Sequence, residues 1–279
     1  MDAAVETITF WQWLHCNNEI IAIVIDSALL LITVISAIIA LFAYRHQKKR
    51  RKKEEACNLA KFYSKNIICK YSLITRVLER SGITARIREC FDMNKIADFS
   101  YEELSALLSG ANVEDFISEI KNIEPGIILS VRVAAATSPL EREILMDSYI
   151  KENSETGEKE IVQGSYLQQD FFQDVSDLLN ELEWFSMTCR YGIADETLIY
   201  QSLHQTFLST VWLLYVFIAN LNKDNVNKYY TNIIWLFKLW WKRLDRITTE
   251  SAAMRNKALK KANRALARSK GKVFSGRGV

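Results

Sequence analysis

Apolar residues are distributed unevenly along the chain, and the longest apolar run lies near its beginning. Residues 20–44 form a run of 25 residues that contains a single charge, Asp26. Because about 20 apolar residues cross a bilayer core of ~30 Å, this run predicts a membrane-spanning helix. Residues 197–222 also lack formal charge, but polar Gln, Ser and His residues interrupt their first part. We interpret this second run as a buried core helix.

Beyond residue 53 the apolar positions recur at the spacing of an α-helix. The pattern predicts a helix over 54–79, which would continue out of the membrane as a stalk and stop at Gly82. Ser100 and Ser138 each begin a capping box, and Asn112 is placed to begin another short helix. Three longer amphipathic helices come next, at 166–191, 196–222 and 230–247, with short connections between them.

The sequence therefore predicts an all-α fold, because three consecutive amphipathic helices with short connections pack as an antiparallel bundle. The stretch 127–133 is rich in β-branched residues but isolated, and we expect it to be helical, whereas 151–164 has the composition of a charged surface loop. The predicted segments are a short extracytoplasmic segment, a membrane helix, a basic collar with the helical stalk, a helical bundle and a basic tail, at 1–19, 20–44, 45–80, 81–250 and 251–279.

Charge is strongly partitioned along the chain, although the total is only +3. Residues 1–44 have four acidic and no basic residues, whereas the collar residues 45–53 have seven basic and no acidic ones. Residues 54–250 sum to −9 and the tail sums to +9. Positive charge marks the cytoplasmic side of a span, so we expect the N-terminus outside and the bulk of the chain inside. Five widely spaced cysteines without a C-x-x-C pair agree with a reducing compartment for the main body.

The two basic segments predict contact with a bilayer that contains anionic headgroups, at about 1 kcal/mol per basic residue near the surface. An acidic protein partner of unknown identity is the other target that we consider for the tail. Nucleic acid is the less favoured target, because Phe274 is the only aromatic residue after Trp241. The residues expected to contact lipid or an acidic partner are Arg45, Lys48, Lys49, Arg50, Arg51, Lys52, Lys53, Arg255, Lys260, Lys261, Arg264 and Arg268.

The predicted membrane helix has one face of small and polar residues, which includes Asp26, Thr33, Ala37 and Ala40. Small and hydrogen-bonding side chains on one face are typical of membrane helices that associate. We therefore predict self-association into a homo-oligomer. The alternative for Asp26 is that its carboxylate reaches the outer interface.

Sequence motifs for catalysis or cofactor binding are absent from the chain. It contains neither G-x-x-x-x-G-K nor G-x-G-x-x-G, no G-x-S-x-G, no H-E-x-x-H and no cysteine–histidine set with zinc spacing. We therefore expect no cofactor, no metal and no catalytic residue. The pairs Glu102/Glu103, Glu141/Glu143 and Glu181/Glu183 have the composition of two-carboxylate sites, but we expect them to lie on solvated helix faces.

A patch in the second half of the chain contains Leu179, Asn180, Glu183, then Gly192, Ile193 and Asp195, and later Trp212. Here the chain resembles a bacterial family known only as a domain of unknown function, whose members combine an N-terminal membrane anchor with an all-helical cytoplasmic domain. The resemblance covers about 166–245 and implies no activity. It does imply a bacterial inner membrane as the location. Trp184 departs from the smaller residues usual after the glutamate.

Asn180 and Glu183 are one helical turn apart, beside an apolar stripe, with Arg190 two turns further on. A partly buried carboxylate needs a partner, and Asn180 is near enough to be one. The set Asn180, Glu183, Arg190, Asp195 and Trp212 is therefore either a polar clamp that fixes helix register or a carboxylate–amide cleft.

The function expected from these features is that of a single-pass inner-membrane protein with a cytoplasmic interaction or regulatory domain, which is not an enzyme. One alternative is an effector that acts on the membrane, for example in phage defence, and inserts 197–222 when activated. The other is a membrane-tethered hydrolase.

Overall fold

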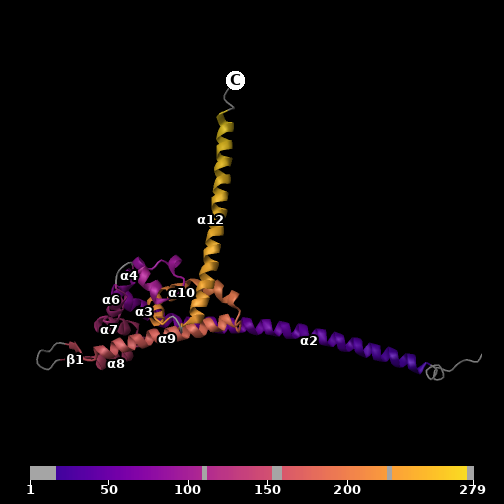
Figure 1. The fold of residues 1–279 in the computed structure, drawn as a ribbon, viewed down its shortest axis with the longest axis horizontal. Coiled ribbons are helices and arrows are strands. Elements are labelled where there is room, and N and C mark those ends of the chain that lie inside the picture. Colours follow the sequence, from indigo (N-terminus) through magenta and orange to yellow (C-terminus); the bar gives the residue numbers. More distant parts are fainter. Residues whose placement is uncertain (1–16, 109–111, 153–158, 225–227, 275–279) are drawn as a thin grey trace, which may run out of the picture. The chain divides into compact units, whose positions relative to one another are not determined.

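The structure is a computed structural model that describes residues 17–108, 112–152, 159–224 and 228–274 (Figure 1). The chain divides into two compact units, Met1–Glu54 and Glu55–Val279. Within the described residues, the regular structure is helical except for one two-stranded sheet. The predicted all-α class is confirmed.

The helices and strands of Figure 1 have the following bounds: α2 Asn18–Phe62, η1 Tyr63–Ile67, α3 Ile68–Arg80, α4 Ile83–Cys90, η2 Met93–Lys95, α5 Tyr101–Leu107, α6 Val113–Lys121, α7 Pro125–Ala135, α8 Pro139–Tyr149, β1 Ile150–Glu152, β2 Lys159–Ile161, α9 Gly164–Arg190, α10 Glu196–Leu213, α11 Tyr215–Leu221 and α12 Thr231–Phe274.

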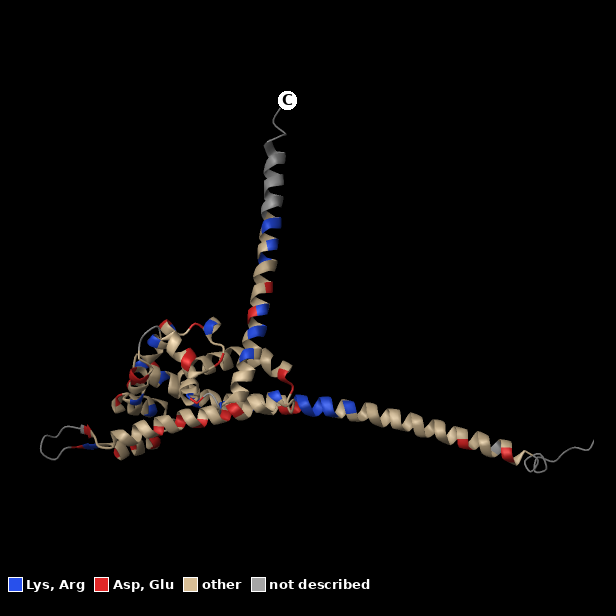
Figure 2. Ribbon diagram, viewed as in Figure 1, with Lys and Arg blue, Asp and Glu red and all other residues tan. Residues whose placement is uncertain are grey.

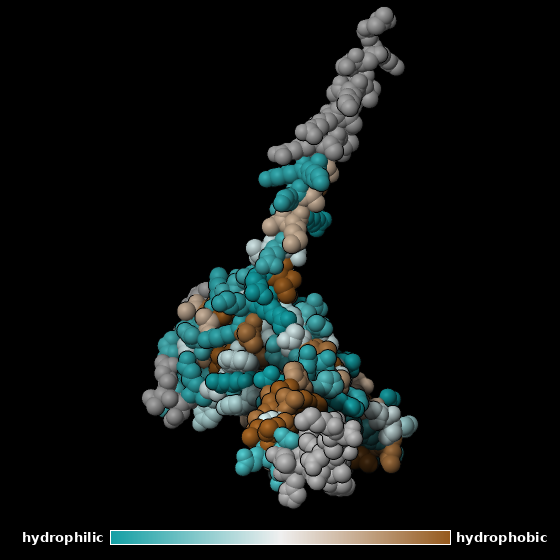
Figure 3. All heavy atoms as spheres, turned by 90° about the vertical axis from the view of Figure 1, so that its right-hand side faces the viewer, coloured by the Kyte–Doolittle hydropathy of each residue, from teal (hydrophilic) through white to brown (hydrophobic). Residues whose placement is uncertain are grey.

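The first unit contains the apolar part of α2, and residues 22–44 are exposed. Among the described residues, one helix is by itself long and apolar enough to cross a membrane, and none of its most apolar stretch is buried within the protein. The bent pair of α10 and α11 passes the same test only if the two helices are counted as one span. The brown side chains of Figure 3 include this exposed apolar stretch. The aromatic residues Phe10, Trp11 and Trp13 lie outside the described residues.

The second unit begins within α2, well before Gly82, where the predicted stalk would have ended. Ala56, Leu59 and Tyr63 are buried, and the buried stripe continues through a π-helical turn into α3 with Ile67 and Ile74. The boundary between the units falls at Glu54/Glu55 instead of near residue 80. The segment from 56 to 80 is therefore part of the folded core and not a separate stalk, because its apolar face packs against α7 and α9.

The short helices begin where the capping residues predict. The Ser100 side chain accepts a hydrogen bond from the Glu103 N–H, and the Ser138 side chain accepts one from the Glu141 N–H. The Asn112 side chain accepts from the Glu114 N–H at the start of α6. Each cap satisfies an N–H group that the first helical turn leaves without a partner. The expected end of the first of these helices at Gly110 lies outside the described residues.

The structure confirms the helix predicted for 127–133 but differs from the loop predicted for 151–164. Residues 127–133 lie inside α7, as expected, with Pro125 in its first turn. The predicted loop over 151–164 instead contains an antiparallel hairpin, in which Ile150 pairs with Ile161. Only three residues pair in each strand, which is too short a stretch to produce a visible period-two pattern.

The three long helices of the second half pack against one another around a shared core. Helix α12 contacts both α9 and α10, and the Trp240 ring is fully buried among Phe185, Tyr200 and Phe207. The apolar run 197–222 supplies much of this core, as predicted, and is divided into α10 and α11 by a bend of 55°. The final part of α12 is different, because residues 251–262 are all exposed.

Cys189 gives a test of this packing, since its thiol is buried on α9 beside Glu196. Burial raises the pKa of Cys189 to about 12, and the negative charge of Glu196 contributes to the rise. An unfolded thiol titrates near ~8.5, so the folded state holds this proton more tightly. The resulting stabilisation is complete below about pH 8.5 and is lost as the pH rises from there toward 12.

We therefore expect iodoacetamide at about pH 8 to alkylate the exposed Cys57 and Cys69 of the full chain in mild detergent while Cys189 remains unmodified. Mass spectrometry of peptides after timed alkylation measures the three rates. Alkylation of Cys189 as fast as that of Cys69 would contradict a packed interface at this position.

Candidate functional site

The Glu183 carboxylate lies at the first turn of α12, although Glu183 itself belongs to α9. Its Oε1 accepts hydrogen bonds from the Asn232 backbone N–H at 3.1 Å and from the Asn232 Nδ2 at 2.7 Å. Its Oε2 accepts one from the Ile233 N–H at 3.0 Å. The first N–H groups of a helix have no partner within that helix and bear partial positive charge, so a carboxylate is well suited to cap them. We call this contact, formed by Glu183, Asn232 and Ile233, the α12 joint.

Arg190 and Asn180 also form hydrogen bonds at or beside the α12 joint, but the pairing of Asn180 with Glu183 that the sequence predicts is not formed. Arg190 donates from Nη1 to the Asn232 Oδ1 at 3.0 Å. The Asn180 Oδ1 accepts from the Tyr230 hydroxyl at a long 3.5 Å, so Asn180 does not pair with Glu183. The expected amide partner is replaced because the start of α12 offers several unpartnered donors to the half-buried carboxylate.

This geometry determines what the carboxylate can do chemically. Both oxygens of Glu183 accept hydrogen bonds from backbone N–H groups of α12. The arrangement is therefore that of a structural contact between α9 and α12. Among the described residues, no group of three or more His, Cys, Asp and Glu side chains is placed to hold a metal ion.

Asp195 is the N-cap of α10, where its side chain accepts from the Leu198 N–H at 3.3 Å. The next residue, Glu196, accepts a hydrogen bond of 2.6 Å from the indole N–H of the buried Trp240. Arg243 lies 3.6 Å from the same Glu196 oxygen, and its guanidinium lies over the Tyr200 ring. The start of α10 is thus joined to α12 by a second polar contact, about two turns beyond the α12 joint.

Trp212 does not join the other predicted residues. Its indole N–H donates to the Phe91 carbonyl at 3.0 Å, and its ring lines a cavity of about 470 Å³. Asp92 and Asn94 at the edge of this cavity hydrogen-bond to each other, and the carboxylate of Asp92 has a lowered pKa because it accepts from the Asn94 backbone and side chain. Of the five predicted residues, Glu183 and Arg190 therefore meet at Asn232, whereas Asn180, Asp195 and Trp212 contact other groups.

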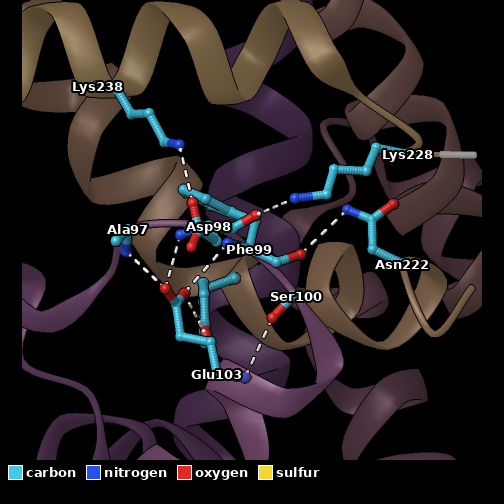
Figure 4. Close-up of polar contacts among 9 residues, drawn as sticks. Ala97, Asp98, Phe99, Ser100, Glu103, Asn222, Lys228 and Lys238 are labelled. Atoms are coloured by element: carbon cyan, nitrogen blue, oxygen red, sulfur yellow. Dashed lines mark hydrogen bonds and ion pairs between the residues drawn. The ribbon is translucent and has the colours of Figure 1, made fainter. Parts of the chain in front are cut away.

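Glu103 forms a polar cluster that sequence reasoning did not identify (Figure 4). Its carboxylate accepts from three consecutive backbone N–H groups, those of Ala97, Asp98 and Phe99, at 2.7, 2.6 and 3.1 Å. It also accepts from the Tyr215 hydroxyl at 2.8 Å. Burial and this bond to Glu103 raise the pKa of the Tyr215 hydroxyl. The cluster fixes the loop before α5 against α11.

Asn222 links this loop to the turn before α12, and its side chain is fully buried. Its Nδ2 donates to the Phe99 carbonyl at 3.1 Å (Figure 4), and its Oδ1 accepts from the Tyr229 N–H at 2.7 Å. Both turns that it joins contain a residue at positive φ, Phe99 at 53° and Tyr230 at 58°. The sequence signal for such a contact is an amide residue directly after an apolar helix, because an amide that becomes buried there needs hydrogen-bond partners.

The expectation that the glutamate pairs lie on solvated faces is wrong for two of the three pairs. Glu103 and Glu183 are half-buried and accept the hydrogen bonds described above, and the half-buried Glu181 pairs with Lys70 at 2.7 Å. Glu141 is exposed, as expected, and accepts from the Thr137 N–H at 2.8 Å. These half-buried glutamates face donors from other elements of the chain, which the spacing along one helix does not reveal.

Apart from the half-buried Lys52, the residues expected to mediate membrane contacts lie on exposed helix surfaces wherever the structure describes their side chains. Asp26, Thr33, Ala37 and Ala40 are exposed along α2, and the Thr33 hydroxyl donates to the Leu29 carbonyl at 2.8 Å. Figure 2 shows the basic residues of 45–53 directly after the uncharged stretch of α2. Within this group Arg50 pairs with Glu54 at 2.9 Å. Arg255, Lys260 and Lys261 are exposed on α12, whereas the side chains of Arg264 and Arg268 lie outside the described residues.

Residues 134–240 match the family described as "Domain of unknown function (DUF4760)". The expected relation to a family of unknown function is confirmed, and the match begins before the 166–245 range that the sequence patch suggested. It contains α8, the hairpin, α9 to α11 and the first part of α12, including the α12 joint. The chain has no significant match among curated proteins or among solved structures.

The α12 joint predicts that Glu183→Gln lowers the free energy of unfolding by about 2 kcal/mol, because an amide loses the charge-assisted bonds and turns an N–H donor toward other donors. Urea unfolding of the full chain in mild detergent, followed by tryptophan fluorescence, measures this change. Glu143→Gln is the matched control, since Glu143 is exposed on α8, and we expect it to change stability by less than about 0.5 kcal/mol. Equal effects of the two substitutions would contradict the assignment.

Proposed function

We propose that this chain is a single-pass bacterial inner-membrane protein, with its N-terminus outside, whose second unit is a non-enzymatic interaction module in the cytoplasm. One observation supports the proposal above the others. A single helix, α2, contains the apolar run 20–44, of which residues 22–44 are exposed, then the basic collar 45–53, and then Ala56 and Leu59 of the buried core.

The exposed run favours a bilayer over water as its surroundings. Its exposed large side chains include Leu30 at 69% and Phe42 at 66% exposure, and each apolar side chain of this size gains about 1.5–3 kcal/mol on leaving water. Soluble proteins rarely expose apolar surface of this extent. The collar then supports an inside location for the second unit, since basic residues beside a span are retained on the cytoplasmic side.

A role in binding rather than catalysis is supported by how the polar groups of the second unit are used. The half-buried carboxylates of Glu103 and Glu183 are engaged by N–H groups of neighbouring elements. Such contacts fix helices relative to one another and leave surfaces available for partners. We propose the anionic leaflet as one partner, contacted by the collar, and either that leaflet or an acidic protein as the partner of the basic tail 251–279.

The topology is tested with the cysteines that the chain already contains. In one variant Cys16 alone is retained, and in another Cys57 alone, with the remaining cysteines replaced by alanine. A membrane-impermeant maleimide is expected to label Cys16 in intact cells and Cys57 only after lysis. Labelling of Cys57 in intact cells, or recovery of the chain in the soluble fraction, would contradict the proposal.

A collar variant is the control for this experiment. Replacing the seven basic residues of 45–53 by glutamine removes the charge that sets orientation and leaves the apolar run unchanged. We expect this variant to remain in the membrane fraction with a mixture of both orientations, so that Cys57 becomes partly labelled in intact cells.

The self-association of the span is a separate prediction, based on the face formed by Asp26, Thr33, Ala37 and Ala40. Asp26→Leu and Ala37→Ile should each weaken dimerisation in the membrane about fivefold, since contacts of this kind contribute on the order of 1 kcal/mol. Crosslinking yield in isolated membranes measures the effect.

Ala28→Ile makes the same change as Ala37→Ile on the opposite side of the helix, because the two alanines are half a turn apart in angular position. It should leave the crosslinking yield unchanged. If all three variants crosslink like the unsubstituted chain, this face does not mediate association.

A further inference from the structure

The second unit contains a cavity of about 230 Å³ between α6, α9 and α11. Ile117 and Ile120 of α6, Val175 and Leu179 of α9 and Phe217 of α11 form apolar walls. A cavity of about 150 Å³ with comparable walls is large enough for benzene, so this one has room for a bicyclic ring. Lys121 and Leu221 also line the cavity and are exposed, which places its opening to solvent at their side.

One polar group in this cavity has no partner within the described part of the protein. Asn220 lines the cavity, and its Oδ1 is buried without a hydrogen bond. A buried acceptor without a donor costs about 1–3 kcal/mol, so a ligand that donates to it gains this energy. A single water molecule is a poor occupant, because it needs two to four polar partners and the walls are mostly apolar.

We propose that this cavity binds a compact, mostly apolar and uncharged molecule that donates one N–H or O–H hydrogen bond to the Asn220 Oδ1. The apolar walls favour the body of such a molecule and disfavour a charge buried among them, since the charged lining residue Lys121 lies at the opening. Because the Asn220 Oδ1 is the lining acceptor that is buried without a partner, a bond to it would orient the ligand. This activity goes beyond the proposed membrane interaction role and does not depend on the topology of the chain.

The cavity also adjoins the α12 joint. Tyr230 is the residue before α12, it lines the cavity, and its hydroxyl donates to Asn180. A bound molecule would therefore contact the turn that precedes the Glu183-capped start of α12. Tyr230 thus lies in the ligand site and directly before the helix turn that Glu183 caps.

Indole and 1-methylindole form a matched pair of probes, because they differ in the N–H donor and share the apolar bicyclic ring. Equilibrium dialysis of each radiolabelled probe against the full chain in nanodiscs measures binding, and empty nanodiscs correct for partition into lipid. We expect indole to saturate the chain and 1-methylindole to bind about tenfold more weakly, the ratio that one hydrogen bond of about 1.4 kcal/mol produces.

Two variants assign this difference to the cavity. Asn220→Leu removes the acceptor, so indole and 1-methylindole should bind with affinities within about twofold of each other. Val175→Phe fills the cavity and should abolish saturable binding of both probes. Val162→Phe makes the same change at a position beside the hairpin that is 47% exposed, and it should bind both probes like the unsubstituted chain.

An unreactive Cys189 thiol in each variant shows that the second unit is folded. The proposal is overturned if indole does not saturate the unsubstituted chain by about 5 mM, if the two probes bind equally, or if folded Val175→Phe binds indole unchanged. The comparison of the two probes on the unsubstituted chain is independent of whether any variant folds. Loss of indole binding on dimerisation would also overturn it, because the cavity would then be occupied by a second copy of the chain.

Discussion

The position of α12 depends on a carboxylate that another helix supplies. Helix α12 begins with Thr231 after a turn, and its own first turn contains no acidic residue. Glu183 of α9 supplies the missing acceptor. This contact fixes the position along α9 at which α12 begins, and it holds the two helices together. Two turns later Trp240 is buried between α9 and α10 and donates to Glu196. A polar contact at the helix start and an apolar one further along thus define a single register.

The turns around this helix are held by a small number of buried polar side chains. Phe99 and Tyr230 adopt positive φ, which costs on the order of 1–3 kcal/mol for residues with a large side chain. Asn222 bonds to the backbone at both turns, and the Phe99 ring packs against Tyr215 and Phe237. The apolar contacts and the buried amide stabilise a backbone that neither turn would adopt alone.

Sequence reasoning succeeded where the determining interactions are local. The capping residues Ser100, Asn112, Ser138 and Asp195 act on N–H groups within three residues, so their pattern locates the helix starts correctly. The burial of the uncharged run 197–222 was also predictable from its amphipathic pattern and interrupting polar residues. These are contacts that a single helix specifies.

The same reasoning failed where the partner is distant in sequence. Glu183 lies 49 residues before Asn232, and Glu103 lies 112 before Tyr215, so spacing along one helix assigned the wrong partner to the first and no partner to the second. The predicted stalk extended too far along the chain for a related reason. Its apolar residues keep the same helical spacing in the exposed and in the buried part, so the spacing does not show where burial begins. The unpartnered Asn220 oxygen likewise becomes visible only when α6, α9 and α11 are assembled.

Hydrogen exchange at the start of α12 tests the central claim most directly. The amides of Asn232 and Ile233 are placed where a helix offers no internal acceptor, and Glu183 is the acceptor that the structure gives them. We predict that both amides are protected in the full chain, and that Glu183→Gln removes this protection while amides in the middle of α9 remain slow to exchange. Fast exchange of these two amides in the unsubstituted chain would contradict the account.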